Sequence, residues 1–122
     1  MKKIFLYVKD KNKKAAAERI CETQQIALHA LSAADLNRTV ASVCGVTMKN
    51  GGTHETAPPL YVMPETLLFY GLDDAALDRF LEAWKESGAE KIVRKAVITP
   101  FNLSLTLYEL IEHLGRESAE MG

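Results

Sequence analysis

Residues 95–102 of the chain read Lys-Ala-Val-Ile-Thr-Pro-Phe-Asn and lead directly into an amphipathic segment. The apolar run up to Ile98 predicts a strand. Pro100 has a fixed φ and keeps Thr99 out of the helical region, at the point where the strand is expected to end. Thr99 or Asn102 is then placed to accept hydrogen bonds from the first amides of a helix. The stretch therefore predicts a strand, a tight turn and a helix.

The residues before this stretch predict another strand and helix. Residues 66–70 form an apolar run that Gly71 ends, and Asp73 is expected to begin a helix that stops at Gly88. Apolar residues recur at helical spacing in this helix and in the last one: Leu77, Phe80, Leu81 and Trp84, then Leu107, Leu110, Ile111 and Leu114. With a strand at 92–98, the second half is predicted to be β-α-β-α.

The first half repeats this order of elements. Strands are expected at residues 4–8 and 26–31, with a helix between them that Asn12 caps and that ends near Glu22. Ser32 and Asp35 have the spacing of a capping arrangement for a second helix, which Gly45 ends. The order of elements is duplicated, but no convincing repeat is visible at the level of single residues.

One domain is expected over residues 1–122, with two β-α-β-α halves, 1–45 and 65–117, joined by a long loop at 46–64. This order predicts an α/β (α+β) protein with a four-stranded sheet and four helices. We favour a ferredoxin-like two-layer sandwich in which the second and fourth helices are additions. The alternative is a doubly wound parallel sheet, but Lys95 and His29 would then be polar groups in a sheet covered on both faces.

The second half resembles a known family. The segment Pro-Glu-Thr-Leu-Leu-Phe-Tyr-Gly at 64–71, the helix with Leu77 and Leu81, and the Lys-Ala-Val-Ile-Thr-Pro-x-Asn segment at 95–102 occur in the same order in the bacterial domain-of-unknown-function family 3783. The resemblance covers about residues 63–117. Where the family has an aromatic residue after the Asn, this chain has Leu105. The resemblance implies no activity, substrate or cofactor.

Composition narrows the class of partner. Fifteen basic and sixteen acidic residues give a net charge of -1, whereas nucleic-acid binding normally needs a basic surplus. No apolar run is long enough for a membrane span or a signal-peptide core, so a cytoplasmic bacterial protein is expected. Cys21 and Cys44 have neither metal-site nor redox-motif spacing and are expected to be reduced.

The best ligand-binding candidates are Thr99 and Asn102 at the last turn, with Gly71 at the preceding strand-to-helix junction. Amides at a helix N-terminus bind anions, so this turn is a candidate site for a small ligand or anion. Capping of the helix by the same residues is the competing interpretation. The Gly51-Gly52 segment would be the lid of such a site. No phosphate-binding glycine pattern occurs, and no cofactor is indicated.

The other polar residues give weaker evidence for a binding or catalytic site. His54 and Glu55 are adjacent in the long loop, but one imidazole and one carboxylate are too few ligands to define a metal site. Glu65 and Lys95 are expected to form an ion pair between neighbouring strands. No catalytic residues and no metal site are assigned, because no nucleophile, base and stabilising donor are predicted to converge.

The sequence therefore favours a non-enzymatic interaction or regulatory module over an enzyme. Self-association or binding of a protein partner is expected through an uncovered sheet face or an edge strand. The alternative is a small-ligand or anion binder at the turn formed by residues 99–102.

Overall fold

A computed structural model describes residues 2–47 and 54–121, with side chains as far as residue 116. The strands are β1 (Lys3–Tyr7), β2 (Ala27–Ala30), β3 (Thr66–Tyr70) and β4 (Arg94–Val97). The helices are α1 (Lys11–Gln24), α2 (Val40–Cys44), α3 (Asp74–Glu86) and α4 (Leu107–Met121), and short 3-10 turns η1 (Ala33–Asp35) and η2 (Asn102–Ser104) precede α2 and α4. This order confirms the expected mixed α/β class, with β-α-β-α occurring twice.

The four strands form one sheet in the order β2-β1-β3-β4. Each half contributes a parallel pair, β1 with β2 and β3 with β4. The two halves meet where β1 pairs antiparallel with β3, and Phe5 lies opposite Leu68 at the middle of this pairing. The two most apolar strands are therefore central, and the two shortest form the edges.

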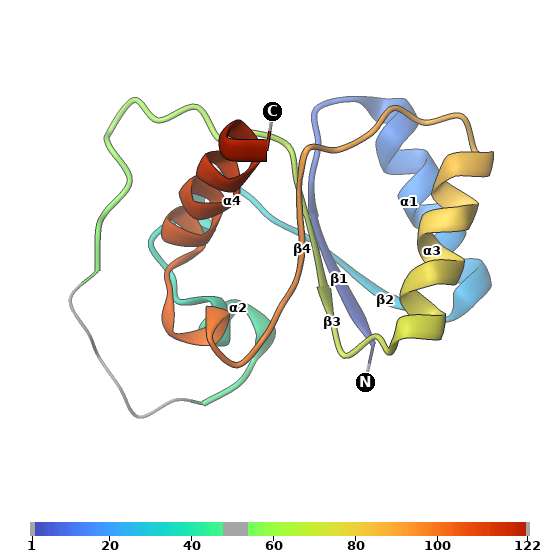
Figure 1. Ribbon diagram of the computed structural model, residues 1–122, viewed down its shortest axis with the longest axis horizontal. Coiled ribbons are helices and arrows are strands. Elements are labelled where there is room, and N and C mark those ends of the chain that lie inside the picture. The colour runs from blue at the N-terminus through green and yellow to red at the C-terminus, as the bar shows by residue number, and fades with distance from the viewer. Residues whose placement is uncertain (1, 48–53, 122) are drawn as a thin grey trace.

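Helices cover both faces of the sheet (Figure 1). On one face, α1 and α3 pack over side chains of β1 and β3, with Ile4, Leu67, Phe69, Phe80 and Trp84 in one buried cluster. On the other face, α2 and α4 pack over Phe5 and Leu68. Because successive side chains of a strand point to opposite faces, only continuous apolar runs can serve as β1 and β3.

This arrangement differs in detail from both expected architectures. The sheet with α1 and α3 is the favoured two-layer core, and α2 and α4 are the additions, here covering the second face. A ferredoxin-like sheet splits each β-α-β unit by inserting another strand, whereas the two strands of each unit are direct neighbours here. The parallel alternative is wrong, because β1 and β3 are antiparallel.

The argument against a sheet covered on both faces rested on His29 and Lys95, and their positions explain why it was wrong. His29 lies on β2 and Lys95 on β4, and both are exposed. Both residues lie on edge strands, where their polar side chains keep contact with water although helices cover both faces of the sheet. Polar residues in a predicted strand therefore identified the edges of the sheet rather than an open face.

The structure also reveals a repeat of single residues that the sequence analysis did not find. The Leu31 amide donates to the Leu6 carbonyl (2.8 Å), and the Ile98 amide donates to the Phe69 carbonyl (2.8 Å) at the equivalent place. From there the two halves correspond at a constant interval: Ser32 with Thr99, Asp35 with Asn102, Leu36 with Leu103, Thr39 with Thr106 and Val40 with Leu107. The halves are two copies of one unit related by an approximate twofold axis through the β1–β3 pairing.

A second contact lies on the same axis. Thr39 and Thr106 form an isolated antiparallel bridge, in which the Val40 amide donates to the Leu105 carbonyl (2.7 Å) and the Leu107 amide donates to the Arg38 carbonyl (2.9 Å). These two bonds are equivalent under the repeat. Main-chain hydrogen bonds thus connect the residues before α2 with those before α4, on the sheet face that these helices cover. They fix where both helices begin.

Several helix ends differ from the expected ones. Asp10 rather than Asn12 caps α1, and its carboxylate accepts the Asn12 amide (2.8 Å). The Ser32–Asp35 capping box is present, but it closes η1 and α2 starts only at Val40. Likewise, α4 begins at Leu107 rather than directly after Asn102. The predicted caps Asp73, Gly45 and Gly88 lie where the sequence placed them, and both glycines have a positive φ.

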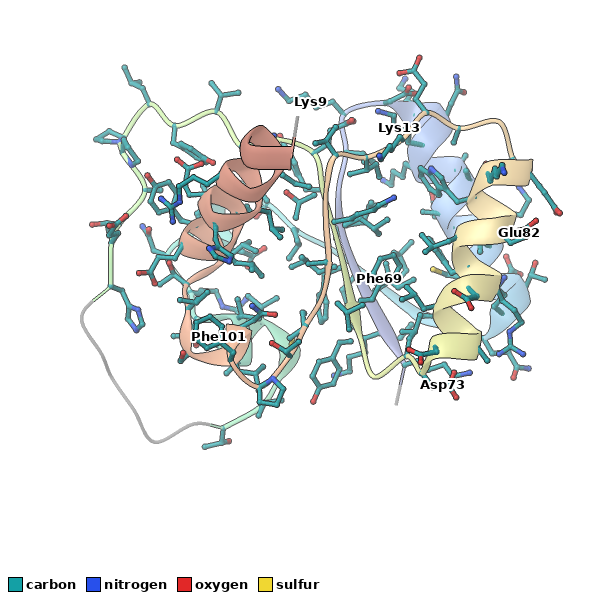
Figure 2. The ribbon with its side chains drawn as sticks, in the orientation of Figure 1. Lys9, Lys13, Phe69, Asp73, Glu82 and Phe101 are labelled. Atoms are coloured by element: carbon teal, nitrogen blue, oxygen red, sulfur yellow. The ribbon has the colours of Figure 1, made fainter. Side chains whose placement is uncertain are left out.

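Glu65 does not pair with Lys95 as expected. Its carboxylate accepts a hydrogen bond from Lys13 of α1 and another from the Lys9 amide (3.2 Å). The Lys13 side chain is nearly buried, so this pair joins the first turn of α1 to the start of β3. Figure 2 shows Lys13 at the end of the sheet where α1 begins.

Truncation at the centre of the sheet should be costly. Leu68 is fully buried opposite Phe5, so Leu68→Ala should lower the free energy of unfolding by about 2–5 kcal/mol. Val97 lies on the edge strand with 41% of its surface exposed, and Val97→Ala should cost roughly 1 kcal/mol or less. Urea denaturation at one protein concentration measures both. Equal losses would contradict the strand order.

The Lys13–Glu65 pair should make stability depend on pH. The hydrogen bond from Lys13 holds the pKa of Glu65 below its ordinary value of 4.5, so the folded protein binds this proton more weakly than the unfolded chain does. The stabilisation is complete at neutral pH and is lost as the pH falls through the lowered pKa. Glu65→Gln should therefore cost about 1–3 kcal/mol at pH 7.

In urea denaturation the cost of Glu65→Gln should shrink as the pH falls through the lowered pKa of Glu65, because the wild-type carboxyl then becomes neutral as well. Glu82→Gln on the exposed surface of α3 is the matched control and should change stability little at either pH. A deficit of Glu65→Gln that stays constant from pH 7 to pH 3 would show that the charge of Glu65 has no part in it.

Candidate functional site

The turn at residues 99–102 is closed by its own side chains. The Asn102 carboxamide oxygen accepts the Thr99 amide (2.9 Å) and the Thr99 hydroxyl (3.0 Å). The first amides of α4 have different partners: the Glu109 amide donates to the Thr106 hydroxyl oxygen (3.2 Å), which lies in the residue just before α4. Asn102 thus closes the turn before η2 but does not cap a helix, because Phe101, the residue before η2, makes no side-chain cap hydrogen bond.

Gly71 lies close to this turn in the sheet. Parallel pairing of Phe69 with Val97 places the ends of β3 and β4 at the same edge, so Gly71 and Thr99 follow neighbouring strands. A ligand at Thr99 would have to displace Asn102 from the Thr99 amide. Ligand binding by Thr99, Asn102 and Gly71 stays a prediction, and its expected lid, Gly51-Gly52, lies outside the described residues.

The side chain of His54 contacts Glu109 and not the adjacent Glu55. Its Nδ1 lies 2.9 Å from Glu109 Oε1, which also accepts the Thr106 amide (2.9 Å). Burial acts to raise the pKa of Glu109, but hydrogen bonds from Thr106, His54 and the Glu55 amide outweigh it and the pKa is lowered. Glu109 therefore caps α4 and fastens the loop at residues 54–55 to it, which is a structural role.

The two thiols of the chain are shielded from solvent. Cys21 and Cys44 are free and buried. Burial raises the pKa of Cys21 to about 11 and also raises that of Cys44, so both are neutral thiols near pH 7. Within the same residues no cluster of His, Cys, Asp and Glu could hold a metal ion, and no helix is long and apolar enough to cross a membrane.

Edge strand β2 exposes unpaired peptide groups. The amides of Ala27 and Leu31 donate to β1, at Lys2 (3.1 Å) and Leu6 (2.8 Å). Since peptide groups alternate in direction along a strand, those of Leu28 and Ala30 point away from the sheet. No described strand lies beyond β2. Two donors and two acceptors are thus aligned along a free edge, which is the arrangement that accepts another strand.

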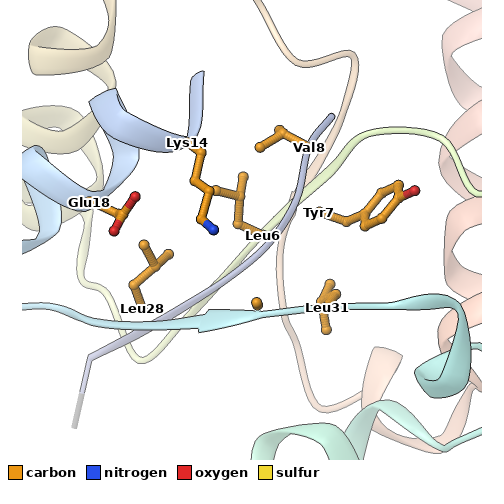
Figure 3. A pocket seen from close by; sticks show the side chains of 8 residues that line it. Leu6, Tyr7, Val8, Lys14, Glu18, Leu28 and Leu31 are labelled. Atoms are coloured by element: carbon orange, nitrogen blue, oxygen red, sulfur yellow. The ribbon is translucent and has the colours of Figure 1, made fainter. Parts of the chain in front are cut away.

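A hollow of ≈ 410 Å³ lies beside this edge, between β2 and the first turns of α1 (Figure 3). Its apolar wall includes Leu6, Val8 and Leu28. Lys14 and Glu18 reach into it from α1, one turn apart on the helix. The hollow is therefore apolar at its base and carries one positive and one negative group at its rim, which suits an aliphatic side chain from an added strand.

Edge strand β4 is protected where β2 is not. The repeat places Arg94 and Lys95 where β2 has Ala27 and Leu28. Lys95 is exposed at the edge of the sheet. Partial burial of its side chain lowers the pKa of Lys95, and the charge of Lys91 lowers this pKa further. Charged side chains on an edge strand oppose pairing with another sheet, because they would lose their hydration. Only one of the two equivalent edges is open to an added strand.

A known family matches the second of the two halves. Residues 65–121 match the model of the family Domain of unknown function (DUF3783), which confirms the resemblance seen in the sequence. The match begins just before β3 and ends with α4. No curated protein and no solved structure gives a significant match to the chain. The matched family assigns no activity to this unit.

The sequence predicted an uncovered sheet face or an edge strand as the interaction surface, and helices cover both faces of the sheet. The sequence did not identify which edge strand would be used. The signal was present, because residues 27–30 read Ala-Leu-His-Ala without Lys, Arg, Asp, Glu or Pro, whereas residues 94–97 begin with Arg-Lys. Its meaning depends on the strand order. An uncharged sequence is ordinary in a central strand. At an edge it leaves the strand without charged side chains that would oppose pairing with another sheet.

Substitutions at Asn102 distinguish capping from other roles. Asn102→Ala should lower the free energy of unfolding by about 1 kcal/mol, because the Thr99 amide and hydroxyl lose their acceptor. Asn102→Asp should retain most of the stability, since Asp35 accepts the Ser32 amide (2.9 Å) at the equivalent place in the first half. Thermal unfolding measures both. Destabilisation by Asn102→Asp as large as that by Asn102→Ala would contradict the equivalence of the two turns.

Proposed function

We propose that the protein is a non-enzymatic interaction module that associates with a second copy of itself through edge strand β2. The observation that supports this most directly is the difference between the two edges, since β4 carries Arg94 and Lys95 and β2 carries no charged residue. Antiparallel pairing of β2 with its copy would extend the four-stranded sheet across the interface by main-chain hydrogen bonds.

Twofold association also suits the charges at this edge. Lys14 and Glu18 lie together beside the hollow, so a second copy related by a twofold axis presents both signs of charge at the same rim. The surface is then complementary to itself. The protein's expected bacterial origin and cytoplasmic location remain predictions, as does its single-domain organisation.

Leu28→Lys should disrupt this association, because it gives β2 the protection that Lys95 gives β4. Sedimentation velocity should show a dimer for the wild type and a dissociation constant at least about tenfold higher for Leu28→Lys, equivalent to about 1.4 kcal/mol. The matched control is Val97→Lys on β4, which adds the same charge at the other edge and should leave the dimer intact.

Circular dichroism should show that both lysine variants are folded. A wild-type protein that sediments as a monomer at all concentrations would overturn the proposed function. The same conclusion would follow if Val97→Lys weakened the dimer as strongly as Leu28→Lys.

A further inference from the structure

We infer that the two β2 strands pair in one register, with His29 opposite the partner's His29 on the twofold axis and Leu28 of each copy seated in the hollow of the other. This inference rests on the proposed function and adds to it which residues meet. The direction of the peptide groups limits the possible registers, and the side chains select one of them.

In an antiparallel pair, residues directly opposite each other point to the same face of the sheet. A twofold axis perpendicular to the sheet keeps the faces of the two copies aligned. One residue of β2 must therefore lie directly opposite its own copy, with the axis between the two. The possible centres within the exposed part of the strand are Leu28, His29 and Ala30.

Centring on His29 matches the free peptide groups. Leu28 then lies opposite the partner's Ala30, and each residue has an outward amide and carbonyl to exchange with the other. Centring on Leu28 would oppose Ala30 to Ile26, whose amide is already donated to the Cys21 carbonyl (2.8 Å). Centring on Ala30 would oppose Leu28 to Ser32, whose amide is donated to Asp35 (2.9 Å). Only in the register centred on His29 do the outward amides and carbonyls of both Leu28 and Ala30 find partners within the paired strands.

Side-chain sizes select the same register. The α1 face of β2 carries a large residue, Leu28, and a small one, Ala30, and both line the hollow. With His29 on the axis, the partner's Leu28 lies beside Ala30, where the hollow offers space and an apolar wall of Leu6 and Val8. The register centred on Leu28 would instead bring Ile26 there, but this side chain is buried in its own core.

The other face of the sheet is compatible with this placement. His29 is exposed and its ring stacks on Phe5, with centroids 5.3 Å apart and planes inclined by 22°. An aromatic neighbour holds the imidazole against β1 and leaves its outer side toward the edge. The pair of His29 side chains would not be hydrogen-bonded through their peptide groups, and the Cα atoms of such a pair lie about 4.5 Å apart.

Cysteine scanning across the axis tests this register. Under mild oxidation His29→Cys should form an intermolecular disulfide, because a separation of about 4.5 Å falls within the range that a disulfide spans. Ala27→Cys, on the same face of the same strand, should not crosslink, because four residues along the strand separate it from its copy by roughly 13 Å. The native Cys21 and Cys44 are buried, so the wild type is the blank. Non-reducing gel electrophoresis gives the readout.

A second measurement keeps His29 in place. An equimolar mixture of Leu28→Cys and Ala30→Cys proteins should form a mixed disulfide, whereas neither variant alone should crosslink. Crosslinking of Leu28→Cys alone, or absence of the mixed disulfide in a mixture that sediments as a dimer in reducing buffer, would overturn the register and leave the proposed self-association standing. Wild-type protein that sediments as a monomer would overturn both.

Discussion

The antiparallel pairing of β1 with β3 is the contact on which the rest of the structure depends. It brings the two most apolar strands together at the centre of the sheet, where both faces must be covered. Each half supplies one helix to either face, so neither half could bury its central strand alone. The pairing also fixes the two shortest strands as the edges and sets the twofold relation between the halves, from the strand centre at Phe5 and Leu68 to the bridge between Thr39 and Thr106.

The same relation gives meaning to the differences between the halves. Two copies of one unit present two equivalent edges, and sequence changes at equivalent positions then decide what each edge does. Lys95 on β4 carries a charge that pairing with another sheet would desolvate, whereas Leu28 at the equivalent place on β2 is an apolar side chain beside a hollow. The proposed interaction surface therefore depends on the absence of charged residues at one edge of the sheet and not on a cluster of reactive groups.

Polar clusters elsewhere in the described residues have structural roles that account for them. Glu109 accepts hydrogen bonds from the residue before α4 and from the adjoining loop, Asn102 closes its own turn, and the Lys13–Glu65 pair joins α1 to β3. Each of these groups is attractive as a candidate site in the sequence, because carboxylates, amides and imidazoles are also the groups of binding sites. The partners of Asn102 are local, whereas Lys13 lies 52 positions from Glu65 and His54 lies 55 positions from Glu109, so only the folded structure shows these two contacts.

The sequence alone determined the elements and their order, because apolar periodicity, capping residues and helix-ending glycines act over a few neighbouring residues. The strand at 66–70, the cap at Asp73 and the turn at Thr99 follow from such local rules. Strand order and direction were decided only by the tertiary structure, since pairing between β1 and β3 joins residues about sixty positions apart and no local rule specifies it. The residue-level repeat stayed hidden for the same reason: it is carried by hydrogen-bond positions around Ser32 and Thr99 more than by residue identity. Which strands form the edges of the sheet, and hence which strand the proposed association would use, is likewise a property of the assembled sheet.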